Sequence, residues 1–139
     1  MRRLSFVGVC LTSVLLLFGT AGTPAVASTS VPVTIQATVI LGPFTGTWSA
    51  SGGINDSGTL TESTDFRVGH HQLHVVRVMT GSKGTITMVI DVSLTRGIGP
   101  WAVIAGTGAY AQLHGQGTDV GVIVDGAVTE TLTGSVHFD

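Results

Sequence analysis

The stretch TITMVIDVSLTR (Thr85–Arg96) decides the fold class of this chain. Isoleucine, methionine, isoleucine, valine and leucine stand at every second position, and most of the residues between them are threonine, aspartate or serine. Successive side chains of a β-strand point to opposite faces, so this alternation predicts a strand with one buried face. The segment Gln72–Thr80 and the turn cluster Gly81–Gly84 come directly before it, which predicts a β-hairpin.

The same alternation recurs through the rest of residues 28–139, and no helical period interrupts it. Val120–Val124 and Val128–Phe138 flank Asp125-Gly126, a dipeptide that favours a tight hairpin turn. We expect the last strand to direct Val128, Leu132, Val136 and Phe138 inward. Further strands are predicted within residues 33–41, 44–51, 59–68 and 101–105.

About eight sequential strands with short connections predict an all-β fold. Eight is a natural number for closing a small up-and-down antiparallel barrel, and closure removes the exposed sheet edges. A β-sandwich built from the same strands is the alternative.

The segment GTGAYAQLHGQGT (Gly106–Thr118) contains four glycines. It is not a dinucleotide fingerprint, because a long helix and a parallel strand would have to follow, and only Ala109–Leu113 could be helical. It also lacks the Gly-Lys-Ser/Thr end of a phosphate-binding loop. Glycines within strands mark bends, so we predict a sharp corner at the rim of the sheet, plugged by Tyr110 and Leu113.

The longer pattern WAVIAGTGAYAQLHGQGT (residues 101–118) resembles the glycine motif of allene oxide cyclase and dirigent-like barrels. Most of residues 40–139, which end in TGSVHFD, are similar to small secreted bacterial proteins of that kind. The resemblance implies an eight-stranded antiparallel barrel with an apolar lumen.

The catalytic residues of the cyclases do not carry over to this chain. Their likeness would imply a carboxylate on the first strand, but VPVTIQATVIL (residues 31–41) contains no acidic residue. Neither the cysteine of the cyclases nor the acid-and-aromatic set of the dirigent-like proteins has a counterpart. We therefore assign no catalytic residue from the resemblance.

The N-terminus has the pattern of a secretory signal peptide. A basic start (residues 1–3) precedes the apolar run Leu4–Phe18, and the small-x-small sequence Ala25-Val26-Ala27 follows. The run is short for a membrane-spanning helix. We expect cleavage of residues 1–27, secretion of the protein, and a single domain over residues 28–139. A retained N-terminal anchor is the alternative.

Cysteine content and charge exclude several classes of function. The single cysteine, Cys10, lies in the predicted signal peptide, so the mature chain would have no disulfide, thiol nucleophile or thiolate metal site. Loss of Arg2 and Arg3 leaves four basic residues against eight acidic ones, a net charge of −4. Without a basic stripe we expect no nucleic-acid partner. We also expect no cofactor, and no membrane association after signal cleavage.

Three charged residues fall on predicted apolar strand faces. Glu62 and Glu130 are the only glutamates, and Arg77 shares a face with Leu73 and Val75. A charge inside an apolar barrel is costly unless it is paired. One hypothesis is a lumenal set that orients a ligand or works as an acid–base pair. The alternatives are a structural ion pair, or a one-residue bulge that turns these side chains to water.

Histidines and aromatic residues supply further candidates. His70, His71 and His74 could ligate a metal such as zinc, although a polar loop with exposed histidines is the plainer interpretation. His114 precedes Asp119 by five positions, but no activated nucleophile accompanies them.

Candidate ligand-binding residues are Trp48, Arg77 and Tyr110. Inward-facing aromatic residues such as Trp48 and Trp101 are also ordinary core residues.

Three functional hypotheses follow from these observations. The first is a secreted, non-catalytic barrel that binds a small hydrophobic molecule in its lumen. The second is an isomerase or cyclase in which Glu62 or Glu130 acts as acid and base and Arg77 stabilises negative charge. The third is a solid-core surface or matrix protein. The packing of the lumen distinguishes them, because binding and catalysis need a cavity.

Overall fold

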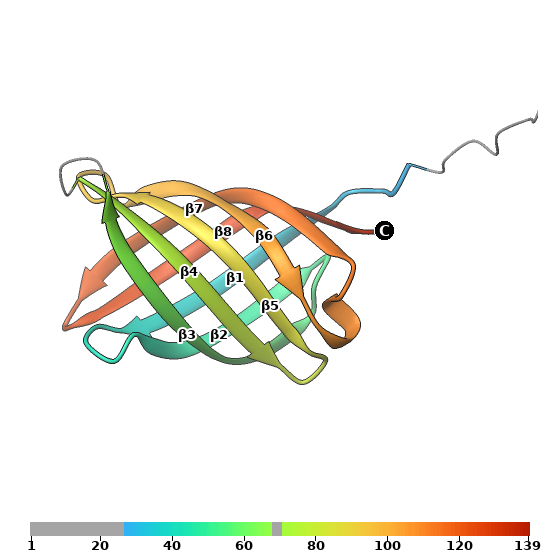
Figure 1. The fold of residues 1–139 in the computed structure, drawn as a ribbon, viewed down its shortest axis with the longest axis horizontal. Coiled ribbons are helices and arrows are strands. Elements are labelled where there is room, and N and C mark those ends of the chain that lie inside the picture. Colours follow the sequence, from blue (N-terminus) through green and yellow to red (C-terminus); the bar gives the residue numbers. More distant parts are fainter. Residues whose placement is uncertain (1–26, 68–70) are drawn as a thin grey trace, which may run out of the picture.

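The computed structural model describes residues 27–67 and 71–139 as a closed antiparallel barrel of eight strands. Each strand pairs with its neighbours in the chain, and β8 closes the barrel by pairing with β1 (Figure 1). The elements are β1 (Val31–Ile40), β2 (Thr45–Gly52), β3 (Asp56–Arg67), β4 (Gln72–Gly81), β5 (Thr85–Ser93), β6 (Ile98–Gly106), the short 3-10 helix η1 (Gly108–Tyr110), β7 (Leu113–Val124) and β8 (Ala127–Phe138). The predicted up-and-down barrel is confirmed, and the sandwich is not formed.

Two of the sequence-based predictions concern residues that the structure does not describe. The predicted signal peptide lies outside the described range except for Ala27, and so does His70. Within the part of the chain that the structure covers, no helix is long and apolar enough to cross a membrane.

The predicted alternation is confirmed for Ile86, Met88 and Ile90, which are fully buried, but β5 ends at Ser93, and Leu94, which the prediction placed on the buried face, is 44% exposed. The inward series of the last strand is confirmed for Leu132 and Val136 but is wrong for Phe138, which is 42% exposed. Phe138 is the last residue of β8 and pairs with Leu113 at the rim of the barrel, where Leu113 is the buried partner.

Trp101 on β6 fills the barrel beside β7 and β8. Its indole Nε1 donates a hydrogen bond to the Thr133 carbonyl oxygen at 3.3 Å. The paired residues Gly117 and Gly134 make room for this ring, since a Cβ on either would lie 2.7 Å from an atom of Trp101. The glycine-rich side of β7 therefore faces the lumen, and valines such as Val122 face outward.

The turns that follow the even-numbered strands, together with the start of β1 and the end of β8, lie at one end of the barrel, which we call the closed end (Figure 1). The predicted corner is confirmed here: Gly108 has a φ of +60°, and the η1 segment turns the chain so that Tyr110 and Leu113 are buried. The Tyr110 hydroxyl donates a hydrogen bond to Asp56 Oδ2 at 2.8 Å. This hydrogen bond thus attaches the glycine-rich corner around η1 to the start of β3.

We predict that Gly134→Ala destabilises the barrel by about 1–3 kcal/mol, because the added methyl overlaps Trp101 and the Gln116 carbonyl oxygen. Urea unfolding followed by tryptophan fluorescence measures the change. The neighbouring Thr133 is exposed, so Thr133→Val should shift the free energy of unfolding by less than about 0.5 kcal/mol. Equal effects of the two substitutions would contradict this account of Trp101 packing.

Candidate functional site

A pocket of about 150 Å³ opens at the other end of the barrel, which we call the pocket end. The β1–β2, β5–β6 and β7–β8 turns lie at this end. The lining residues come from five strands and two of these turns: Leu41, Phe44, Glu62, Thr64, Leu73, Val75, Val92, Leu94, Gly97, Asp119, Gly121, Ile123, Val128 and Glu130. The walls are therefore mainly apolar, and three carboxylates are the charged groups among these residues.

Arg77 on β4 joins two of these carboxylates beneath the pocket. Its Nε donates a hydrogen bond to Glu62 Oε1 at 2.6 Å, and its Nη2 donates to both Glu62 Oε1 and Glu130 Oε2. Glu62 is the direct cross-strand neighbour of Arg77, whereas Glu130 belongs to β8, on a distant part of the barrel wall. Because Arg77 is 0% exposed, its charge is neutralised inside the lumen rather than by water.

Asp119 on β7 is the third carboxylate, and it is also 0% exposed. Neither of its oxygens has a hydrogen-bond partner among the described residues. Burial raises the pKa of Asp119 to about 7, and the negative charge of Glu130 adds to the rise. Near neutral pH this carboxyl group is therefore partly protonated.

The charges of Glu130 and Arg77 depend on one another. Burial raises the pKa of Glu130 above its ordinary value, and Arg77 opposes this rise. Burial would lower the pKa of Arg77, but the two glutamates outweigh it and hold its pKa above the ordinary value. Arg77 therefore stays protonated, while its Nη1 has no partner among the described residues.

The structure brings together the three charged residues that sequence parity placed on inward faces. Glu62, Arg77 and Glu130 form one cluster, so the bulge that would have turned them to water does not occur. Trp48 and Tyr110 do not line this pocket. Trp48 is buried, and its Nε1 donates to the Thr80 carbonyl oxygen; Tyr110 belongs to the closed end.

Of the three histidine candidates, the structure describes His71 and His74. His71 is exposed in the turn before β4, and Nδ1 of His74 lies 2.7 Å from Asp91 Oδ1 on the outer wall. Among residues 27–67 and 71–139, no group of three metal-ligating side chains has a geometry that fits a metal ion.

Sequence reasoning did not select Asp119 as a site residue. The alternating valines after it, Val120, Val122 and Val124, give the clearer hydrophobic pattern, but they lie on the outer face of β7. The glycines at positions 115, 117 and 121 carried the missing signal, since they share the parity of Asp119 and leave space for the side chains of Trp101 and Glu130. His114 has the opposite parity and is exposed, so it does not contact Asp119.

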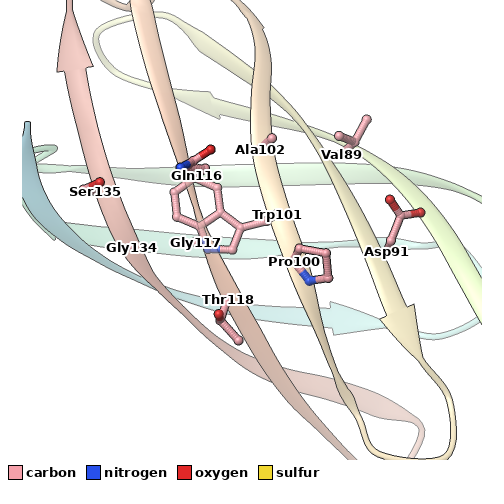
Figure 2. A pocket seen from close by; sticks show the side chains of 10 residues that line it. All are labelled: Val89, Asp91, Pro100, Trp101, Ala102, Gln116, Gly117, Thr118, Gly134 and Ser135. Carbon is pink, nitrogen blue, oxygen red and sulfur yellow. The ribbon is translucent and has the colours of Figure 1, made fainter.

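A wider and shallower groove of about 480 Å³ lies along the outer wall over β5–β8. Figure 2 shows Asp91 on β5, Pro100 on β6 and Thr118 on β7 around it. The lining is mixed in polarity, and the charged side chain among the lining residues is Asp91, which pairs with His74. The pocket at the pocket end is thus more enclosed than the outer groove, and its lining includes a carboxyl group without a partner among the described residues, Asp119.

Comparison with known proteins gives a limited likeness. No protein-family model matches the chain, and no curated protein matches it. Among solved structures, the chain is similar to the pterocarpan synthase dirigent protein GePTS1, with a TM-score of 0.42 and 15% identity over 89% of this chain and 100% of that chain. At this identity no residue role transfers.

We predict that Arg77→Met destabilises the protein by about 3–5 kcal/mol at pH 8, because it leaves two buried carboxylates without their counter-charge. The loss should be smaller at pH 4, where protonation removes much of that charge. Urea unfolding at both pH values measures it. Arg96→Met alters an exposed arginine and should have little effect; equal losses in the two variants would contradict the role of the cluster.

We predict that Asp119→Asn makes the protein more stable than the wild type at pH 8. The folded chain holds this proton up to a pH of about 7, whereas an unfolded aspartate loses it near pH 4, so wild-type stability falls as the pH rises through that window. The variant should gain about 2–4 kcal/mol at pH 8 and almost nothing at pH 4.

Urea unfolding between pH 4 and 8 tests this difference. The same substitution at Asp125, an exposed carboxylate in the β7–β8 turn, serves as the control and should produce no pH-dependent gain. A pH-independent effect of Asp119→Asn would contradict the burial of an uncompensated carboxyl group.

Proposed function

We propose that this protein is a secreted barrel that binds a small, largely apolar molecule in the pocket at its pocket end. We call the charged cluster of Glu62, Arg77, Asp119 and Glu130 the floor of the pocket. The observation that carries the proposal is that this enclosed, mainly apolar pocket has in its floor a fully buried carboxyl group, Asp119, without a partner among the described residues. Ligand pockets typically combine apolar walls with a few such polar groups that orient the ligand. The leader pattern of residues 1–27 supports secretion.

The volume limits the part of the ligand that the barrel encloses. An engineered apolar cavity of about 150 Å³ in another protein accepts benzene, and this pocket has the same volume. One ring or a short alkyl segment therefore fits inside. Leu41, Leu94 and Ile123 form an exposed apolar rim, with Ile123 69% exposed, so a longer body would continue against these side chains.

The cost of the charged floor supports a binding role over a solid core. A buried ion pair seldom stabilises a fold more than apolar residues of similar size would. Three carboxylates around one arginine are therefore a poor choice for stability alone. They are well suited to recognise the polar part of a ligand.

A second candidate function is acid–base catalysis in the same pocket. The specific observation that favours it is the pKa of Asp119, which lies near 7, where a group both gives and takes protons efficiently. An isomerase or cyclase would use this group together with Glu62 or Glu130. Conversion of a bound ligand by the wild type, with a rate that Asp119→Asn abolishes, would support this function over simple binding.

Native mass spectrometry of residues 28–139, purified from culture medium of an exporting host and mixed with cell extract, tests the binding proposal. We expect an adduct that denaturation releases as an organic molecule. Val92→Phe places a larger side chain in the pocket wall and should abolish the adduct.

Val122→Phe makes the same substitution at an exposed position outside the pocket lining and should retain the adduct. Both variants must unfold cooperatively for the comparison to hold. A bare mass from every source, or equal adducts in the two variants, would overturn the proposed function.

A further inference from the structure

The charge of the pocket floor is unbalanced. Four strands each place one ionisable side chain in the cluster: Glu62 from β3, Arg77 from β4, Asp119 from β7 and Glu130 from β8. The inward residues of the other strands in this region are apolar, including Val39 on β1 and Ile90 on β5. Among the described residues, three carboxylates therefore share a single cation.

Several carboxylate oxygens of the cluster are not used by Arg77. Arg77 bonds Oε1 of Glu62 and Oε2 of Glu130, which leaves the second oxygen of each glutamate outside those bonds. Both oxygens of Asp119 are buried and unpartnered within the described part of the chain. All three residues line the pocket. The floor thus offers several hydrogen-bond acceptors, whereas Arg77 is engaged by two carboxylates through Nε and Nη2 and keeps one donor group, Nη1, without a partner among the described residues.

We propose that the pocket recognises a primary ammonium group on a small apolar body, such as an arylalkyl or short alkyl amine. This inference rests on the proposed function and adds the chemical class of the ligand. An ammonium group has three donors and no acceptor, so it can meet the carboxylates of Glu62, Asp119 and Glu130 together. It also supplies the missing positive charge, and charge-assisted hydrogen bonds of this kind are the strong ones.

The opposite ligand class is disfavoured on the same grounds. A carboxylate ligand would place a fourth negative charge beside groups that lack water to screen it. A neutral alcohol can donate only one hydrogen bond to the floor. The order of affinity for a common apolar body is therefore amine, then alcohol, then acid.

Protonation of the floor links binding to pH. Near neutral pH Asp119 is partly protonated because of its burial, and a bound cation favours its ionised form. Binding of an amine that is itself protonated should therefore release a proton near neutral pH. The affinity should rise between pH 5.5 and 8, as Asp119 ionises without the ligand's help.

A matched series of probes tests the proposal: benzylamine, benzyl alcohol, benzoate and toluene share one ring of the size that the pocket encloses. Isothermal titration at pH 7.5 with residues 28–139 measures the affinity of each probe. We expect benzylamine to bind at least tenfold more tightly than benzyl alcohol or toluene, and benzoate to bind most weakly.

Asp119→Asn should lower the affinity for benzylamine at least tenfold relative to the affinity of the same variant for toluene, because the substitution removes the charge that recognises the ammonium group. In two buffers of different ionisation enthalpy, the wild type should release protons on binding benzylamine and the variant should not. This second measurement separates loss of a recognition group from a change in pocket shape.

The outcomes separate the two proposals. If toluene binds but benzylamine shows no advantage over benzyl alcohol or benzoate, the amine inference is overturned and the apolar pocket stands. If none of the four probes binds, and Val92→Phe also leaves every titration unchanged, both the pocket function and the amine inference fail.

Discussion

The ion pairs of Arg77 across the lumen are the interaction on which the interior depends. One guanidinium, fully removed from water, binds Glu62 on the neighbouring strand and Glu130 on β8, 53 residues along the chain. These bonds fix two carboxylates at a single depth of the barrel. The cluster of Arg77, Glu62 and Glu130 thereby separates two parts of the lumen. Side chains fill the part towards the closed end, and the pocket lies towards the pocket end.

The filled region is built by matching large residues to small ones. Trp101 occupies the space that Gly117 and Gly134 leave, because a Cβ on either glycine would overlap its ring. At the closed end, hydrogen bonds from Ser82 and Tyr110 overcome the effect of burial and hold the pKa of Asp56 below its usual range. Side chains therefore fill the closed end, and the pocket that contacts Glu62, Asp119 and Glu130 lies at the pocket end.

The chemistry of the pocket follows from this asymmetry. Apolar side chains from β4, β5, β7, β8 and two turns make most of the walls, and the three carboxylates of Glu62, Asp119 and Glu130 are the charged groups of the lining. A low-dielectric site strengthens every charge interaction within it, and it also raises the cost of a charge without a partner. The ionised form of Asp119 is therefore disfavoured by burial, which raises the pKa of this group to about 7.

The sequence by itself determined the strands, the tight turns and the inward direction of Glu62, Arg77 and Glu130. These features depend on two-residue periodicity and on residues such as Asp125-Gly126, which act over a few positions. The inward face of β7 was not predictable in this way, because its glycines carry no hydrophobic signal and its valines face outward. Only the tertiary structure decided that Arg77 meets Glu130 and that Asp119 has no partner among the described residues, since barrel closure sets which distant strands face each other across the lumen.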